Sequence, residues 1–312
     1  MLEKLGEKFI HIFLKYLPNS FVFAIILTLI TGIVAIAWLE VSPMEIIKFW
    51  YMGFFDLLGF SMQIVLIIIT GFSIALSPLV KRGIGALSTY IKTPAQVYFV
   101  VVFIGMLLSM ISFGWVVITC VLARELALRV KGINYPFLIA CAYFSFNSWV
   151  LGFSSSIPLL LNSDNNFMIE TGLLSAVIPT TYTLQSSLNI AMMGLIVIGG
   201  SLLMFLLRPK HFKNKELSDL TLSNGISDQK TIKEEASELH LPFTALSDKL
   251  NNSILLQMII FIMGLTYIVF HFSTRGFDLN FNIMIFIFLI VGMALHQTPS
   301  RYAIAMKRSS SN

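Results

Sequence analysis

The sequence contains few charged residues. They make up only 12% of its 312 residues, about half the share found in ordinary soluble domains. A soluble protein of this length needs more polar surface, so a soluble globular fold is excluded. Apolar residues make up 56% of the chain and form continuous runs long enough to cross a bilayer, which takes about 20 residues of helix. We expect an all-α, polytopic protein embedded in the lipid bilayer of the cell's inner membrane.

Cysteine and histidine are also scarce. The two cysteines, Cys120 and Cys141, lie in apolar runs without metal-ligand spacing, and the five histidines form no ligand pair. We therefore predict no metal site and no cofactor. The sequence contains neither a P-loop nor a nucleophile–base arrangement, so we do not expect an enzyme. The net charge of +5 is explained by Lys and Arg in cytoplasmic loops, and nucleic acid is not an expected partner.

The apolar residues form seven predicted membrane segments. These segments are Pro18–Leu39, Met52–Val80, Ala95–Val130, Tyr135–Leu161, Leu188–Leu207, Ser253–Phe272 and Asn280–His296. Residues 162–187 are polar and predict a loop with an interfacial part. Residues 208–252 are highly charged and predict a cytoplasmic, partly disordered linker. This linker divides the chain into an N-terminal block, residues 1–207, and a shorter C-terminal block, residues 253–312.

The distribution of Lys and Arg predicts how the segments cross the membrane. A cytoplasmic N-terminus places the basic residues that follow the second segment inside, as the positive-inside rule requires. A single crossing by Ala95–Val130 would then place the basic residues that follow it outside. A re-entrant hairpin removes this conflict, with arms Ala95–Met110 and Trp115–Val130 and a tip at residues 111–114. The alternative is a single span that follows the charge rule only weakly.

Two places in the sequence predict interrupted helices at membrane depth. One is the hairpin tip, and the other is the small-residue run at residues 152–156, ahead of Pro158. Carriers bind substrate at such breaks, where half-helix N-termini face an anion. Because no basic residue lies deep in these segments, backbone and hydroxyl groups would hold a carboxylate. The predicted substrate-binding residues are Ser112, Phe113, Gly114, Asn147, Trp149, Gly152, Ser154, Ser155 and Ser156. The alternative is a helix-packing face of small residues.

Asp56 and Gln63 are the candidates for ion coupling. They are seven residues apart in the predicted helix Met52–Val80, so we expect them to share a face. An acid within a membrane segment is a functional candidate, and the coupling ion would be H⁺ or Na⁺. The alternative is that Asp56 lies at the membrane interface without a role in transport.

Short motifs occur in order along almost the whole chain. They include Lys92-Thr93-Pro94, Ala140-Cys141-Ala142-Tyr143, Gly152-Phe153-Ser154, Leu295-His296 and Thr298-Pro299. In these motifs the chain resembles the short-chain fatty acid transporter family. The resemblance implies a secondary carrier of short-chain fatty acids or similar small monocarboxylates. It also implies two inverted repeats, each with a re-entrant hairpin and a discontinuous helix, and substrate bound between their tips.

The chain departs from the family pattern in two ways. Its hairpin tip reads Ser112-Phe113-Gly114-Trp115, whereas the family tends toward an Asn-Trp-Gly tip, so the identity of the acid stays open. The family also continues beyond the region of Tyr302, so we expect residues 253–312 to be the first helices of a truncated second repeat. The alternatives are an inactive remnant, or half of a split carrier that needs a complementing C-terminal fragment or a homo-oligomer. A membrane-bound acyl-handling enzyme is the alternative from another class.

Overall fold

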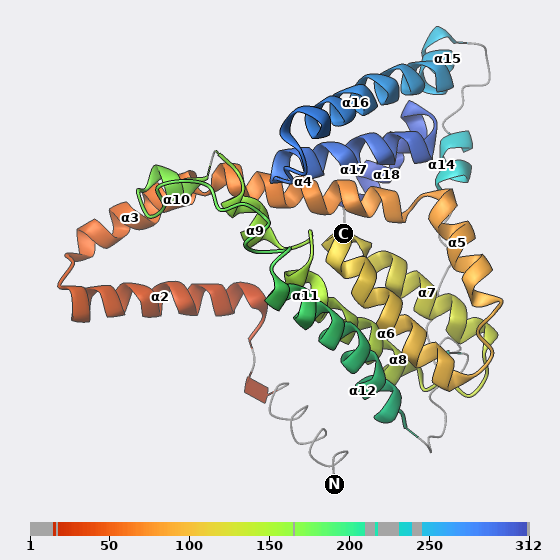
Figure 1. Ribbon diagram of the computed structural model, residues 1–312, viewed down its shortest axis with the longest axis horizontal. Helices are drawn as coiled ribbons and strands as arrows, with labels where there is room; N and C mark the ends of the chain where they lie inside the picture. The colour runs from red at the N-terminus through yellow and green to blue at the C-terminus, as the bar shows by residue number, and fades with distance from the viewer. Residues whose placement is uncertain are drawn as a thin grey trace. The chain divides into compact units, whose positions relative to one another are not determined.

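The computed structural model describes residues 15–16, 18–164, 166–209, 216–217, 231–238 and 245–310. Every regular element in this part of the chain is helical (Figure 1). Six helical stretches are long and apolar enough to cross a membrane: Phe21–Leu39, Leu58–Ala75, Pro94–Ile111, Tyr135–Leu161, Ser187–Leu206 and Leu246–Arg275. The expectation of an all-α polytopic membrane protein is confirmed. Most of the predicted linker, residues 208–252, lies outside the described residues.

The chain divides into two compact units, Met1–Gly59 and Phe60–Asn312. In the first unit, α2 (Ser20–Leu39) begins after Asn19, whose side chain accepts a hydrogen bond from the Val22 N–H at 2.9 Å. The next helix, α3 (Pro43–Asp56), begins with a capping box in which Ser42 and Glu45 exchange hydrogen bonds. These caps satisfy N–H groups that the first turn of a helix leaves without partners.

The predicted helix Met52–Val80 is wrong, because the structure divides this segment among three helices. Helix α3 ends at Asp56, α4 covers Leu58–Ala75 and α5 covers Pro78–Ser88. Ser77 caps α5, and Pro78 occupies its first turn, where the missing N–H of proline costs no helical hydrogen bond. Asp56 and Gln63 therefore lie on different helices, and the predicted shared face does not exist.

The predicted interruption at residues 111–114 is present in the second unit. Helix α6 (Pro94–Ile111) ends at Ser112, which has extended backbone, and a 3₁₀ turn, η1 (Phe113–Trp115), leads into α7 (Val116–Arg129). The two helices pack against each other (Figure 1) and bury residues such as Val101 of α6 and Leu126 of α7. That both ends of this hairpin face the cytoplasm stays a prediction.

The second interruption is longer than expected. Helix α8 (Tyr135–Phe144) tightens into a 3₁₀ helix, η2 (Ser145–Leu151), and residues 152–155 are not helical before α9 (Ser156–Leu161). The helix thus begins to change seven residues before Gly152. Beyond it lie the short helix α10 (Phe167–Glu170) and a continuous helical stretch of α11 (Ser187–Gly194), the π-helical η3 (Leu195–Gly199) and α12 (Gly200–Leu206).

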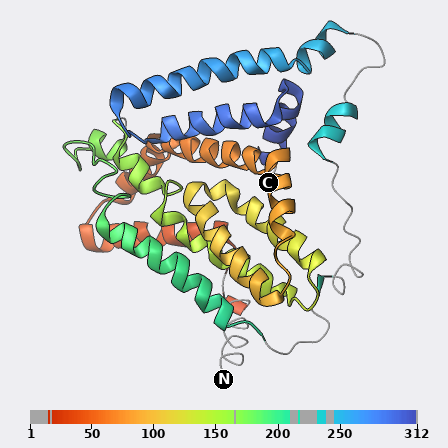
Figure 2. The same ribbon diagram turned by 45° about the vertical axis from the view of Figure 1, so that its right-hand side comes forward.

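Helix α17 (Phe281–His296) lies between α16 (Ile254–Arg275) and α4 (Figures 1 and 2). A hydrogen bond of 3.0 Å from Gln257 Nε2 to the Met293 carbonyl joins α16 to α17. The buried ring of His296 hydrogen-bonds the Ser73 carbonyl at 2.8 Å and joins α17 to α4. The C-terminal block therefore packs directly on the N-terminal block.

Three short helices complete the described chain, and the sequence did not predict them. Two, α14 (Ile232–Glu238) and α15 (Leu246–Asn251), belong to the charged linker, and α18 (Pro299–Ser310) follows α17. Ile232 and Ala236 of α14 bury their side chains against α18, and Glu235 forms an ion pair with Arg308. This part of the linker is ordered because it has an apolar face and a partner helix.

Candidate functional site

The two interruptions contact each other through their backbones. The Ser154 N–H donates a hydrogen bond to the Met110 carbonyl at 3.0 Å, which joins the second break to the end of α6. A side chain on Gly152 would overlap the backbone of Met110. Gly114 also lies close to α4, since a Cβ there would be 2.7 Å from the Ile68 carbonyl oxygen. Both glycines therefore permit close backbone contact.

Buried serines hold the 3₁₀ segment against α6. The hydroxyls of Ser109 and Ser148 share a hydrogen bond of 2.7 Å, and Ser148 Oγ also donates to the Met106 carbonyl at 2.8 Å. Ser145 Oγ donates to the Ala142 carbonyl at 2.6 Å. In lipid every backbone carbonyl must find a donor within the protein, and these hydroxyls supply donors where the α-helical ladder ends.

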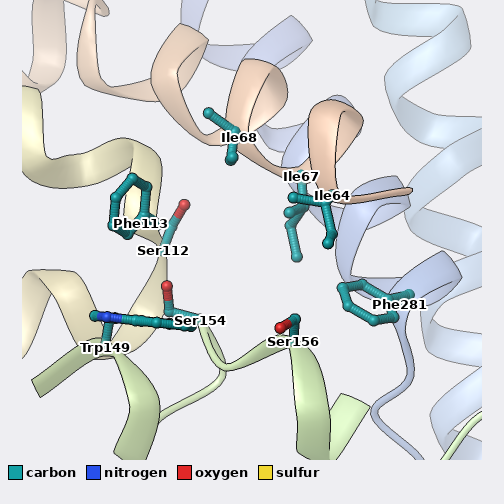
Figure 3. Close-up of a pocket in the computed structure, with 9 residues that line it drawn as sticks. All are labelled: Ile64, Ile67, Ile68, Ser112, Phe113, Trp149, Ser154, Ser156 and Phe281. Carbon is teal, nitrogen blue, oxygen red and sulfur yellow. The ribbon is translucent and has the colours of Figure 1, made fainter. Parts of the chain in front are cut away.

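A cavity of about 270 Å³ lies where the hairpin tip, the second break, α4 and α17 meet (Figure 3). It is lined by Ile64, Ile67, Ile68, Ser112, Phe113, Trp149, Ser154, Ser156 and Phe281. Its volume is slightly below the range of about 300–1,000 Å³ found for drug-sized ligands. The cavity is therefore sized for a small molecule.

The lining of this cavity has a polar side and an apolar side. Figure 3 shows the hydroxyls of Ser112 and Ser154 near the Phe113 and Trp149 rings, and the side chains of Ile64, Ile67 and Phe281 across the cavity. No charged residue lines it. The Ser154 hydroxyl is buried and has no hydrogen-bond partner among the described residues, although buried polar groups normally have one. A ligand with an acceptor group would satisfy it.

The other predicted substrate-binding residues do not line this cavity. Gly114 and Gly152 form its backbone frame, and buried Ser155 donates its N–H to the Gly152 carbonyl at 3.0 Å. Asn147 is exposed, which corrects the prediction that it accompanies Trp149. Because η2 has three residues per turn, residues 147 and 149 point in different directions.

Neither predicted coupling residue lines this cavity. Asp56 is the last residue of α3 and is exposed. The Gln63 side chain donates to Asn282 Oδ1 at 2.9 Å and lines a different cavity. Among the described residues, no group of three or more His, Cys, Asp or Glu side chains could hold a metal ion. A coupling role for Asp56 or Gln63 stays a prediction.

The sequence did not single out the apolar residues of the site. Ile64, Ile67 and Ile68 recur at helical spacing on α4, and Phe281 is the first residue of α17. Helical spacing of isoleucines predicts a buried or lipid-facing stripe equally well. The only sequence signal was the neighbouring Gln63, a polar residue in an otherwise apolar helix.

The chain is similar to known membrane transporters. A family model described as "Short chain fatty acid transporter" matches residues 1–312. Proteins of Haemophilus influenzae and Escherichia coli, both named "Putative short-chain fatty acid transporter", are each 33% identical to the chain over 297 residues. The match covers 94% and 95% of this chain and 65% of each relative, so the chain spans slightly less than two thirds of the length of these relatives.

No solved structure matches the chain. The family model, however, covers it from end to end, and the two relatives match nearly all of it. The predicted family is thereby confirmed, and the chain belongs to the short-chain fatty acid transporter family.

Proposed function

We propose that the chain forms the substrate-binding part of a secondary carrier that moves small monocarboxylates across the inner membrane, coupled to H⁺ or Na⁺. The observation that carries this proposal is the cavity between the two interrupted helices, with serine hydroxyls on one side and isoleucines on the other. Broken helices that meet around a small cavity are the usual substrate site of carriers. The N-terminus would lie in the cytoplasm.

A short-chain fatty acid has the same division into polar and apolar parts. Its carboxylate would accept hydrogen bonds from Ser154, which has no other partner among the described residues, and from Ser112 or Ser156. Its tail would contact Ile64 and Ile67. Hydrogen bonds to a charged group contribute about 1.5–3 kcal/mol each. Burial of a three-carbon tail contributes about 2.4 kcal/mol at about 0.8 kcal/mol per carbon.

The lack of a basic residue in the cavity suits transport better than tight binding. A carrier must release its substrate on the other side, and an Arg or Lys paired with the carboxylate in a low-dielectric site would oppose release. Hydroxyl and backbone donors hold the anion less strongly. We therefore expect weak binding. The space beside Ile64, Ile67 and Phe281 would limit the length of the fatty-acid tail that the cavity accepts.

Binding of labelled butyrate to the purified chain in detergent tests this proposal without requiring a complete transport cycle. Ser154→Ala should weaken binding about tenfold, since it removes a donor to a charged group worth about 1.5 kcal/mol or more. Ser156→Phe should abolish binding by filling the cavity. Asn147→Ala is the matched control, because Asn147 is exposed on the same segment.

Uptake of labelled butyrate by cells that lack their own uptake system provides the second measurement. Loss of both binding and uptake in Ser156→Phe, with Asn147→Ala unchanged, would support the site. Unchanged butyrate binding in a correctly folded Ser156→Phe variant would show that the cavity is not the substrate site.

A further inference from the structure

A second cavity lies on the other side of a wall formed by α4 and α17. Its volume is about 370 Å³. It is lined by Gln63, Ser163, Asp164, Tyr267, His271, Arg275, Asn280, Asn282, Ile283 and Phe286. In contrast to the first cavity, most of these side chains are polar. Of its lining residues, Gln63 was a candidate from the sequence, for ion coupling.

Neighbouring residues of the same helices line the two cavities. On α4, Gln63 lines the polar cavity and Ile64 lines the apolar one. At the start of α17, Phe281 lines the apolar cavity, and Asn282 and the cap residue Asn280 line the polar one. The hydrogen bond of 2.9 Å from Gln63 Nε2 to Asn282 Oδ1 joins the two helices at this wall. A single side-chain pair thus lies at the boundary between the cavities.

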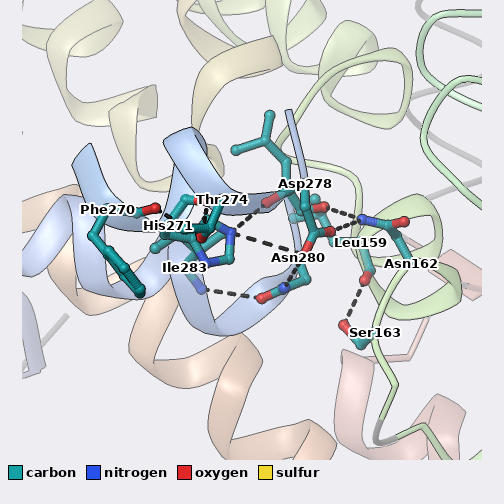
Figure 4. Close-up of polar contacts among 10 residues, drawn as sticks. Leu159, Asn162, Ser163, Phe270, His271, Thr274, Asp278, Asn280 and Ile283 are labelled. Atoms are coloured by element: carbon teal, nitrogen blue, oxygen red, sulfur yellow. Dashed lines mark hydrogen bonds and ion pairs between the residues drawn. The ribbon is translucent and has the colours of Figure 1, made fainter. Parts of the chain in front are cut away.

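A polar network fixes the rim of the second cavity (Figure 4). The His271 ring, 6% exposed, hydrogen-bonds the Asp278 carbonyl at 2.9 Å. Asp278 Oδ1 accepts a hydrogen bond from Asn162 Nδ2 at 2.7 Å, and Asn280 caps α17 by accepting the Ile283 N–H at 3.2 Å. These contacts hold the α16–α17 loop against the end of α9, so the cavity has a rigid frame.

Two of the side chains that remain available to a ligand, Asn282 and Arg275, offer donors. Asn282 Oδ1 already accepts from Gln63, which leaves the Asn282 amide N–H₂ group as a donor. Arg275 has no hydrogen-bond or ion-pair partner among the described residues, and its planar guanidinium matches a carboxylate. Asp164 is the one acidic residue in the lining, and like Arg275 and Asn282 it is exposed to solvent. A monocarboxylate can pair with the Arg275 guanidinium through two parallel hydrogen bonds, with the Asn282 amide as a further donor.

We propose that this cavity is a second carboxylate-binding site, in which the substrate waits, held by Arg275 and Asn282, before it passes the Gln63–Asn282 pair into the apolar cavity. The inference rests on the proposed function, because it takes the same class of ligand. It adds a site outside the interrupted helices, with a charged anchor that the first site lacks. As the acid moves from the polar to the apolar cavity, its carboxylate would leave the Arg275 guanidinium and accept hydrogen bonds from serine hydroxyls instead.

Cysteine labelling distinguishes the two sites. In a background in which Cys120 and Cys141 are replaced by Ala, because both are free thiols, Ser163→Cys reports on the polar cavity and Ser156→Cys on the apolar cavity. Asp164→Cys is a second reporter for the polar cavity in case Ser163→Cys does not fold. Each variant is treated in membranes with an anionic methanethiosulfonate reagent, with and without butyrate. At ten times its dissociation constant, butyrate should slow labelling about tenfold at each site.

Arg275→Gln supplies the decisive comparison. It should weaken butyrate protection of Ser163→Cys about tenfold or more, as loss of a charge-assisted hydrogen bond does, while protection of Ser156→Cys persists at saturating butyrate. Lys249→Gln is the control, because it removes a positive charge from an exposed position of α15. It should not change the butyrate protection of Ser163→Cys or of Ser156→Cys.

Each result decides between the two proposals. Protection at Ser156→Cys but not at Ser163→Cys or Asp164→Cys would overturn the second site and leave the proposed function intact. Protection only in the polar cavity would support the second site and refute substrate binding in the first. Absence of protection at all three positions would refute both, and protection of Ser163→Cys that is unaffected by Arg275→Gln would overturn the role of Arg275.

Discussion

The two cavities are built by opposite means, although they share a wall. The apolar cavity lies where α6 and α8 lose their helical backbone, and its polar groups are serine hydroxyls. The polar cavity lies at the ends of intact helices, where α16 finishes at Arg275 and α17 begins after its cap, Asn280. The comparison teaches that the local backbone sets the chemistry. Charged and amide side chains line the cavity at the ends of intact helices, whereas hydroxyls and freed backbone groups line the cavity where helices are interrupted.

The largest expected effect tests whether the apolar cavity depends on close backbone contact. Gly152→Val should prevent folding or lower the free energy of unfolding by roughly 3 kcal/mol or more, because the new side chain would overlap the Met110 backbone. The yield and thermal unfolding of the detergent-purified protein would measure this. Gly194→Ala is the control, since a Cβ there meets nothing within 4 Å. Equal stability of the two variants would contradict the close contact.

A smaller effect is expected from the serine network behind the same cavity. Ser148→Ala removes hydrogen bonds to Ser109 and to the Met106 carbonyl, at a cost of about 1–3 kcal/mol for groups left without partners. The thermal unfolding temperature should fall. Butyrate should protect Ser156→Cys less well from labelling, and its protection of Ser163→Cys should stay the same. A variant at the neighbouring exposed residue, Asn147→Ala, should change neither. Equal loss of protection in both cavities would mean that they do not depend on separate supports.

Much of the apolar cavity was predictable because its signals are local. Gly152, Ser154 and the adjacent Pro158 interrupt a helix by their own conformational and hydrogen-bonding properties, so the sequence indicates the break. Ser112 was located differently, because the distribution of Lys and Arg predicted a re-entrant hairpin with its tip at residues 111–114. The isoleucines opposite were not predictable, because an apolar side chain on a membrane helix looks the same whether it faces lipid or a cavity.

The polar cavity could not be predicted, because its residues come from four separate segments. Asp164, Arg275 and Asn282 are unremarkable where they stand in the sequence, at or near ends of apolar runs, where polar residues usually meet the membrane interface. Gln63 was a candidate, but for ion coupling. Only tertiary packing brings them together. The division between α3 and α4 was missed for a related reason. Leu57, at which the helix changes, is neither Pro nor Gly, so a continuous apolar run concealed it.

The wall between the cavities should respond to loss of one hydrogen bond. Gln63→Ala and Asn282→Ala each remove the 2.9 Å hydrogen bond between α4 and α17. Its loss of about 1 kcal/mol should raise roughly fivefold the fraction of molecules in which the two cavities are connected. The labelling of Ser156→Cys should accelerate by about that factor, and the labelling of Ser163→Cys should stay the same. The double variant should add little to either single variant, because both remove the same bond. Additive acceleration would show that the pair does not form the wall.

The smallest effect concerns a region that lines neither cavity and therefore sets the baseline for the comparison. Hydrogen bonds from the Ser42 hydroxyl and N–H hold the pKa of the exposed Glu45 carboxyl below its ordinary value. Because the pKa of Glu45 is lowered in the folded state, its stabilisation of the helix start is complete above the pKa of the unfolded chain, about 4.3. This stabilisation is lost as the pH falls through the pKa of the folded state. Hydrogen exchange normalised for intrinsic rates should therefore show the first turn of α3 fraying in acid. Glu45→Ala should fray at neutral pH, and Glu45→Gln should fray less because its amide oxygen still accepts the Ser42 N–H. Cysteine labelling in both cavities should be unaffected, and a change there would mean that α3 acts on the carboxylate sites.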